Sequence, residues 1–297
     1  MEASRKMAAT DWDAAAFDTH RSLLFSIAYR MLGSASEAED VVQDAWLRAL
    51  QDERADVRSP RAYLTTIVTR LCIDRLRSAE RTRVEYPGPW LPEPLAAPNQ
   101  ESTDLASSLT TAFLVVLEQL SPTERAVFLL RDVFELDFDE IATSVGKSAA
   151  NTRQILTRAR GRLRHSRPRF TVSRRESEEV VKRFRHACVT GNVEALMDVL
   201  HADAELISDG GGKAAAATHP VLGADRIAKF ILGYAGKMHW TESDFELVTI
   251  NGEPGLLMRH PMSGDGTYAF NIADGRIRAI YVVRNPDKLR GFLARTH

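Results

Sequence analysis

The stretch DEIATSVGKSAANTRQILTRARGRLR, residues 139–164, decides the first part of the fold. Ile141 and Val145 lie on one side of a short first helix, and Gly146 can adopt the left-handed backbone that a tight turn requires. Ser148 can cap a second helix by accepting a hydrogen bond from one of its unpaired backbone N–H groups. Two short helices joined by such a turn, the second rich in arginine, predict a helix-turn-helix that binds duplex DNA.

The distribution of charge supports a nucleic-acid partner. Residues 147–169 hold eight Lys or Arg and no Asp or Glu, so this segment can neutralise phosphates and release their counterions. Residues 36–53 carry six acids against Arg48, whereas residues 54–83 carry eight arginines against three acids. The near-neutral total of −1 therefore hides one acidic surface suited to a protein and basic surfaces suited to nucleic acid.

Length and composition describe a chain of several soluble domains. The 297 residues are 44% hydrophobic and 27% charged, which suits two or three globular cores. The two cysteines, Cys72 and Cys188, lie far apart in apolar helical contexts, so we expect no disulfide framework, no metal site and no cofactor. Because no long apolar run and no apolar leader is present, the sequence also predicts no membrane span, no secretion signal and a cytoplasmic location.

Four segments follow from shifts in composition. Residues 1–83 form an all-helical module, in which Ser34 or Ser36 caps a second helix and Ser59-Pro60 opens a third. Residues 84–108 contain five of the twelve prolines and four acids but no Lys or Arg, so they form an extended linker. Its WLPEP stretch, residues 90–94, either docks on another part of the protein or packs against its own domain.

The remaining segments differ in class. Residues 109–169 contain four helices. Ser121-Pro122-Thr123-Glu124 caps the second of them, and the last pair is the helix-turn-helix. Residues 170–297 begin with helices over 176–191 and 193–201, continue with a turn-rich stretch and another helix near 223–235, and end in runs that alternate like strands. The predicted class is multidomain: two all-α domains plus a C-terminal α+β domain with a curved, antiparallel, cone-shaped sheet suited to a ligand pocket.

The first three segments together resemble a sigma-70-type RNA polymerase initiation factor of the small extracytoplasmic-function class. The resemblance rests on LLFSIAYRMLGSASEAEDVVQDAWLRAL for polymerase binding, SPRAYLTTIVTRLCIDRLRS for minus-10 reading, and LSPTERAVFLLRDVFELDFDEIATSVGKSAANTRQILTRARGRL for minus-35 reading. It implies that core RNA polymerase and promoter DNA are the partners, and that the domains are region 2 (1–83), a linker (84–108) and region 4 (109–169). The run Ala150-Asn151-Thr152 stands where Gly-Thr-Val is usual, so promoter details do not carry over.

The last segment resembles the SnoaL-like fold, and a group of sigma factors carries such a domain fused at the C-terminus. WLPEP at 90–94, DGGGK at 209–213 and NPDKL at 285–289 stand where that group has these motifs. The resemblance implies that residues 170–297 regulate the sigma factor in cis. The regulatory residues are Trp90, Leu91, Pro92, Glu93, Pro94, Asp209, Gly210, Gly211, Gly212, Lys213, Asn285, Pro286, Asp287, Lys288 and Leu289.

The DNA-reading residues follow from the two basic helices. Asn and Gln suit adenine, Arg suits guanine, and residues further along the second helix favour phosphate. The minus-35 set is Ser148, Ala150, Asn151, Arg153, Gln154, Arg158, Arg160 and Arg164. The minus-10 set, which would hold the unpaired strand, is Arg58, Arg61, Tyr63, Thr66, Arg70, Asp74 and Arg77. Asp74 has an alternative role as an ion-pair partner of Arg70 or Arg77 on its own helix.

The acidic helix is the expected docking surface for polymerase, with a solvated helix face as the alternative. Its residues are Glu37, Glu39, Asp40, Gln43 and Asp44.

Two other function classes remain open from the sequence. A one-component regulator with a ligand-sensing domain would use the helix-turn-helix but has no use for residues 13–83. A cyclase or isomerase would need acid–base groups in the C-terminal domain, and the candidates there share no fixed spacing. These candidates are His201, Asp203, Asp209, His219, His260 and Tyr268. We expect no catalytic residues and favour a pocket that senses a small ligand over one that turns a substrate over.

Overall fold

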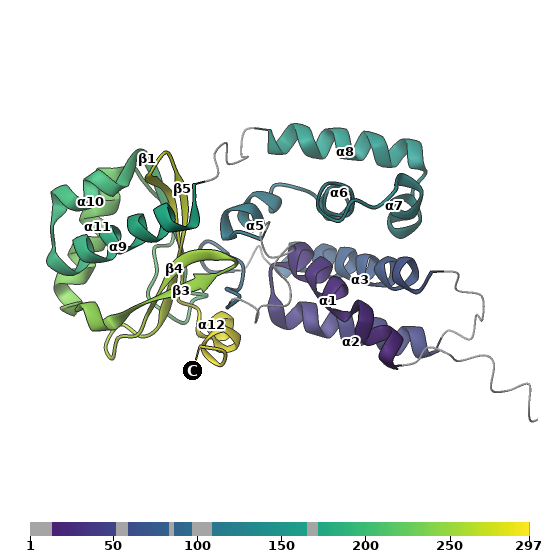
Figure 1. Ribbon diagram of the computed structural model, residues 1–297, viewed down its shortest axis with the longest axis horizontal. Helices are drawn as coiled ribbons and strands as arrows, with labels where there is room; N and C mark the ends of the chain where they lie inside the picture. Colours follow the sequence, from purple (N-terminus) through teal and green to yellow (C-terminus); the bar gives the residue numbers. More distant parts are fainter. Residues whose placement is uncertain (1–13, 52–58, 83–85, 97–108, 165–171, 297) are drawn as a thin grey trace, which may run out of the picture. The chain divides into compact units, whose positions relative to one another are not determined.

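The computed structural model describes residues 14–51, 59–82, 86–96, 109–164 and 172–296. The chain divides into two compact units (Figure 1). The first unit joins residues 1–84 to residues 117–165, and the second joins residues 85–116 to residues 166–297. Each unit is therefore built from segments that are distant in sequence.

The N-terminal part of the first unit is a three-helix bundle. Its helices are α1 (Ala14–Leu32), α2 (Ala35–Gln51) and α3 (Pro60–Thr82). Helix α1 ends at Gly33, whose φ of +69° suits glycine, and the Ser34 hydroxyl then accepts a hydrogen bond from Glu37 N–H at the start of α2. Ser59 caps α3 in the same way through Ala62 N–H. Leucine, isoleucine and valine side chains from all three helices are fully buried.

The second part of the first unit carries the helix-turn-helix. Its elements are α6 (Pro122–Phe128), the π-helical turn η2 (Leu129–Val133), α7 (Phe138–Val145) and α8 (Ala149–Leu163). Ser121 and Glu124 form the capping box that opens α6, which confirms the predicted Ser-Pro-Thr-Glu signal. Helix α5 (Thr111–Leu117) belongs to the second unit as far as Val116, and its Ala112 and Val115 pack in a core of that unit.

The second unit contains a six-stranded sheet in its described residues, in the order β2-β1-β6-β5-β4-β3. The strands are β1 (Leu200–Asp209), β2 (Val221–Leu222), β3 (Phe245–Ile250), β4 (Glu253–Met258), β5 (Gly266–Ala273) and β6 (Arg276–Val283). The predicted strands correspond to β3–β6. The prediction of an antiparallel sheet was wrong for one pair of strands, because β1 pairs with β6 in parallel. Strands β1 and β2 were not predicted and lie mainly in the stretch predicted as turn-rich.

Different segments cover the two faces of this sheet (Figure 1). On one face lie α9 (Arg174–Thr190), α10 (Val193–Val199) and α11 (Ala224–Met238), and on the other lies α12 (Pro286–Leu293). The short helix η3 (Glu242–Asp244) precedes β3. Leu206 and Val282 belong to the core beneath α9–α11, whereas Tyr281 and Val283 belong to a second core that includes Leu91 and Phe292. Strand alternation thus gives each face its own hydrophobic core.

No described helix has both the length and the hydropathy needed to cross a bilayer.

Candidate nucleic-acid interface and linker clamp

The helix-turn-helix is built by local signals. The Asp137 side chain and Glu140 form a capping box at the start of α7, and Gly146 ends that helix with a φ of +65°. The Ser148 hydroxyl accepts a hydrogen bond from Asn151 N–H over 3.2 Å, which confirms Ser148 as the cap of α8. These caps hold the two helices at the turn that the sequence predicts.

The exposed side of α8 carries the predicted minus-35 residues. Its opposite side is buried and includes Ile155, Leu156 and Leu163. Asn151 is half-buried, and the other members of the predicted set are exposed. Those exposed members are Ser148, Ala150, Arg153, Gln154, Arg158, Arg160 and Arg164.

Two arginines of this set have partners within the domain. The Arg153 guanidinium lies 4.7 Å from the centre of the Phe138 ring, which holds it near the start of α8. Arg160 binds Asp132 through two hydrogen bonds of 2.6 and 3.0 Å, and this carboxylate raises the pKa of Arg160. Arg160 therefore links α8 to η2 as well as adding charge to the exposed side.

The predicted minus-10 residues lie on α3, apart from Arg58, which is outside the described residues. Arg61 is exposed, Tyr63 is half-buried, and Asp74 lies 3.7 Å from Arg77, as the ion-pair alternative predicts. Thr66 and Arg70 occupy a different environment because they contact α7 of the helix-turn-helix.

Helix α3, predicted to bind the minus-10 element, contacts α7 of the helix-turn-helix, predicted to bind the minus-35 element. We call α3 and the helix-turn-helix the two DNA readers, and both lie in the first unit. The hydroxyls of Thr66 and Ser144 are 3.0 Å apart. Arg70 donates from Nη2 to the Thr143 carbonyl over 2.8 Å and from Nε to the Ser144 carbonyl over 3.3 Å. Ser144 is 1% exposed, so this part of α7 is closed to any other partner in this conformation.

A buried arginine reinforces the same packing. Arg125 on α6 is 3% exposed and donates 2.7 Å to the carbonyl of Met31 at the end of α1. It also pairs with Glu118 at 2.8 Å, which compensates the buried charge. The sequence did not single out Arg125, because an arginine in an amphipathic helix gives no signal of burial.

The acidic side of α2 is partly engaged by basic neighbours. Arg75 on α3 lies 2.9 Å from Asp44, and Arg21 on α1 lies 2.6 Å from Glu39. Glu37, Asp40 and Gln43 remain exposed. The structure adds Leu47 and Leu50, which are 48% and 44% exposed and follow Asp40 and Gln43 at helical spacing.

In the second unit, a buried carboxylate holds the linker against the C-terminal domain. Asp209, at the end of β1, is fully buried. It accepts hydrogen bonds from the Tyr86 hydroxyl at 2.6 Å and from Leu91 N–H at 2.9 Å. The Lys288 ammonium lies 2.6 Å from the same carboxylate and neutralises it. We call these residues, with Trp90 and Asn285, the linker clamp.

Lys288 and Asn285 bring α12 into the linker clamp. The Lys288 ammonium also donates to the Leu91 carbonyl and lies 4.1 Å from the centre of the Trp90 ring. Asn285 caps α12 through Asp287 N–H and donates from Nδ2 to the Tyr86 hydroxyl over 3.1 Å. Burial, together with the hydrogen bond to Asp209, raises the pKa of Tyr86, so its hydroxyl stays protonated and donates.

The glycines of DGGGK allow a close approach to the linker clamp. Gly211 has a φ of +57°, and a Cβ added there would lie 2.1 Å from the Asn285 amide nitrogen. Gly212 has a φ of +69°, and its Cβ would lie 2.8 Å from Pro87. Both positions therefore require glycine for space as well as for backbone conformation. Lys213 pairs with Asp287, and its hydrogen bond lowers the pKa of that carboxyl.

A second anchor holds the linker further along. Asn251, with a φ of +50°, exchanges two hydrogen bonds of 2.9 Å with the backbone of Leu95 and donates from Nδ2 to the Thr111 hydroxyl over 3.0 Å. Ala96 pairs with Ile250 beside it. Leu95 and Thr111 are thus both bonded to Asn251, a residue that no sequence signal marked.

The structure brings the WLPEP, DGGGK and NPDKL residues together, with Glu93 half-buried and Pro92 and Pro94 buried at the same face. Tyr86 belongs to the same cluster but was not among the predicted residues, although an aromatic residue in a proline-rich stretch was a usable signal.

The acid–base candidates do not gather at one site. Tyr268 is buried under α11, whereas Asp209 belongs to the linker clamp. The histidines support local turns, as in the hydrogen bond that His260 accepts from Ser263 N–H. Among the residues that the structure describes, no group of His, Cys, Asp or Glu side chains has the arrangement of a metal site.

Comparisons with known proteins find two sigma-70 regions in the chain and relatives that are similar over most of its length. The family models for sigma-70 region 2 and sigma-70 region 4 match residues 16–82 and 110–163. The chain is 35% identical to the ECF RNA polymerase sigma factor SigJ of Mycobacterium tuberculosis, over 93% of this chain and 92% of that protein. It is 32% identical to the probable ECF RNA polymerase sigma factor SigI of the same species, over 93% and 94% of the two chains.

One of these relatives has a solved structure with a similar fold. The crystal structure of M. tuberculosis SigJ superposes with a TM-score of 0.77 and 32% identity, covering 94% of this chain and 99% of that one. This chain therefore belongs to the extracytoplasmic-function RNA polymerase sigma factors of the sigma-70 family, in the group with a C-terminal SnoaL-like domain.

Proposed function

We propose that this sigma factor directs promoter-specific initiation in the cytoplasm and that its C-terminal domain regulates it in cis through the linker clamp. Region 2 (1–83) binds core RNA polymerase and melts the minus-10 element, and region 4 (109–169) reads the minus-35 element. The linker (84–108) joins the two readers, and residues 170–297 are the regulatory domain. The observation that carries the proposal is the Asp209–Lys288 pair, because it binds the linker itself.

The linker clamp limits how far the two readers can separate. Fully extended, residues 85–116 would reach up to about 110 Å. In the second unit, however, Tyr86, Leu91 and Leu95 are all bonded to the C-terminal domain, and Thr111 meets Leu95 at Asn251. The bonded linker then contributes only the distance between its fixed ends, which is shorter than its fully extended length. Opening of the clamp would restore that length.

Run-off transcription with purified core polymerase and a candidate promoter tests the proposal. The full chain should initiate, and a chain that lacks residues 174–297 should initiate at a different rate because its linker has no clamp. Absence of initiation by both chains would overturn the sigma-factor activity. Equal rates for both chains would overturn regulation in cis.

The C-terminal domain acts by binding rather than by catalysis in this proposal. The pocket beneath α11 is lined by Leu206, Ile231, Trp240 and other residues that include no Asp, Glu, His or Cys. Of the acid–base candidates in the sequence, Tyr268 lines this pocket. Burial raises the pKa of its hydroxyl, which makes Tyr268 a poor general base near neutral pH. A one-component repressor is also disfavoured, since it would not require region 2.

If α8 binds the minus-35 element as proposed, substitution of two of its arginines should affect promoter binding in different ways. Arg153→Ala should cost about 1–3 kcal/mol at the preferred promoter and less at its variants, because Arg153 lies near the start of α8, which enters the major groove. Arg164→Ala should weaken binding to all promoters alike and reduce the salt dependence by about one counterion. Fluorescence anisotropy of holoenzyme on matched promoter variants measures both. Equal losses across the variants for both substitutions would remove the distinction.

If the exposed side of α2 binds core polymerase, charged side chains in place of its exposed leucines should weaken that binding strongly. The double variant Leu47→Lys, Leu50→Lys should bind core polymerase at least about tenfold more weakly, because exposed leucines beside Asp40 and Gln43 are the apolar contacts of the proposed interface. A pull-down with core polymerase measures the loss. This pair is a cleaner test than Asp40→Lys, Asp44→Lys, which also breaks the Asp44–Arg75 pair.

The matched control for that experiment is Val193→Lys, at a 54% exposed apolar residue of α10 in the other unit. It should leave polymerase binding unchanged. Full binding by the Leu47, Leu50 double variant would show that α2 is a solvated helix face.

A further inference from the structure

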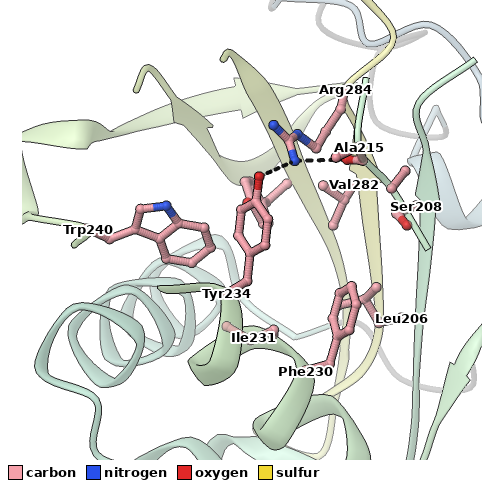
Figure 2. A pocket seen from close by; sticks show the side chains of 11 residues that line it. Leu206, Ser208, Ala215, Phe230, Ile231, Tyr234, Trp240, Val282 and Arg284 are labelled. Atoms are coloured by element: carbon pink, nitrogen blue, oxygen red, sulfur yellow. Dashed lines mark hydrogen bonds between the residues drawn. The ribbon is translucent and has the colours of Figure 1, made fainter. Parts of the chain in front are cut away.

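A pocket lies on the face of the sheet opposite the linker clamp. It has a volume of about 180 Å³ and is bounded by β1, β6 and α11. Leu206, Ile231 and Val282 line it with apolar groups, and Trp240 closes one side. Figure 2 shows Arg284 at one end, beside the Tyr234 hydroxyl, and Phe230 toward the other end.

Arg284 places a positive charge in this apolar setting. It is 7% exposed and donates from Nη1 to the Ala215 carbonyl at 2.8 Å and to the Tyr234 hydroxyl at 2.9 Å. Its Nη2 donates to the Ser263 carbonyl. All three acceptors are neutral, and among the described residues no carboxylate forms an ion pair with it. Burial of a charge without an opposite charge is costly, so an anion would be stabilised beside Arg284.

Two N–H donors of residues that line the pocket have no hydrogen-bond acceptor among the described residues. Arg284 Nε is buried and has no hydrogen-bond partner, and the same holds for Nε1 of Trp240, a residue that is 7% exposed. Buried donors without partners are uncommon in folded proteins and often mark a missing ligand or ion. A guanidinium with an unused Nε–H suits a carboxylate, which accepts two parallel hydrogen bonds from such an edge.

We propose that this pocket binds a small aromatic carboxylic acid as its anion. The carboxylate pairs with Arg284, and the ring lies among Ile231, Val282 and Trp240. The volume sets the size, because a cavity of about 150 Å³ accommodates a benzene molecule. One ring with a short acid arm therefore fits. An amine would repel Arg284, and a neutral isostere would leave its charge uncompensated.

The position of the pocket connects the ligand to the linker clamp. Ser208 and Arg284 line the pocket, and the next residue along each chain segment, Asp209 and Asn285, belongs to the linker clamp. Neighbouring strand residues point to opposite faces of the sheet, and the Asp209 carbonyl accepts hydrogen bonds from the N–H groups of both Arg284 and Asn285. A shift of Arg284 toward a ligand therefore acts directly on the backbone of the clamp. This regulatory consequence rests on the proposed function, whereas binding itself does not.

Isothermal titration of the full chain with phenylacetate, phenylacetamide and benzylamine tests the ligand class. Phenylacetate should bind at least about tenfold more tightly than the amide, and benzylamine should show no binding. Arg284→Gln should lose at least about tenfold in phenylacetate affinity. Arg278→Gln is the matched control on β6, the strand that Arg284 follows, because Arg278 is exposed and pairs at the surface with Asp274. The affinity of this variant should equal that of the wild type.

A second variant separates loss of binding from loss of folding. Ala216→Trp fills the pocket from its border and leaves Arg284 in place, so it should abolish phenylacetate binding while the circular dichroism spectrum is retained. Failure of phenylacetate to bind at about 10 mM, equal binding of the three probes, or unchanged binding to Ala216→Trp would each overturn the proposal.

Transcription assays distinguish this proposal from the proposed function. Phenylacetate that binds at the pocket but leaves run-off transcription unchanged would overturn the link to the linker clamp and retain the binding site. Failure of the chain to initiate without any ligand would concern only the sigma-factor activity.

Discussion

Asp209→Ala is expected to lower the free energy of unfolding of the C-terminal unit by about 3–5 kcal/mol, and its melting temperature by about 10 °C. The substitution leaves the Lys288 ammonium, whose side chain is 9% exposed, without its counter-charge. It also leaves the Tyr86 hydroxyl and Leu91 N–H without their acceptor. Loss of one member of a buried ion pair costs more than loss of both, because the remaining charge stays desolvated.

Urea unfolding followed by circular dichroism measures this loss, and Trp90 emission reports the linker because its ring lies against Lys288. The double variant Asp209→Ala, Lys288→Met should recover part of the stability. The matched control is Asp287→Ala, which removes the exposed ion pair with Lys213 and should change the free energy of unfolding far less than Asp209→Ala does. A loss below about 1 kcal/mol for Asp209→Ala, or strictly additive single losses, would show that the pair does not hold the clamp.

The same buried pair shows where sequence reasoning reached its limit. The motif DGGGK marked Asp209 as notable, and the positive φ angles of Gly211 and Gly212 agree with a conformation that favours glycine. The resemblance placed Asp209 among the regulatory residues but named no partner for it. Its partners are Tyr86, Leu91 and Lys288, which are far from Asp209 in the chain, and such long-range partners have no periodic signal in one sequence.

The sequence predicted well those elements whose formation depends on residues close together in the chain. The caps at Ser121 and Ser148, the turn at Gly146 and the strands β3–β6 follow from neighbouring residues, and the structure confirms them. Strand β1 was missed because its pairing is not local: it lies parallel to β6, and its first half carries exposed polar residues that read as a turn. Arg125 and Arg284 were missed because burial of an arginine depends on acceptors from other elements.

A disulfide that locks α3 to α7 is expected to reduce run-off transcription at least about 100-fold, with recovery on reduction. The minus-10 and minus-35 elements are centred about 25 base pairs apart, or about 85 Å at about 3.4 Å per base pair. In the first unit, however, Thr66 and Ser144 touch, and the 15 residues of α8 add only about 22 Å at 1.5 Å per residue. The two readers therefore have to separate before both can bind one promoter.

The double variant Thr66→Cys, Ser144→Cys provides the lock, since the two hydroxyl oxygens are 3.0 Å apart. Burial raises the pKa of Cys72 and of Cys188, so the native thiols remain protonated and do not compete for the new pair. The oxidised lock should still bind core polymerase in a pull-down, because the exposed side of α2 is unchanged, and Thr66→Cys alone should be insensitive to oxidant. Full transcription by the oxidised double variant would mean that the two readers stay in contact on the promoter. Regulation could then not act by controlling the separation of the readers.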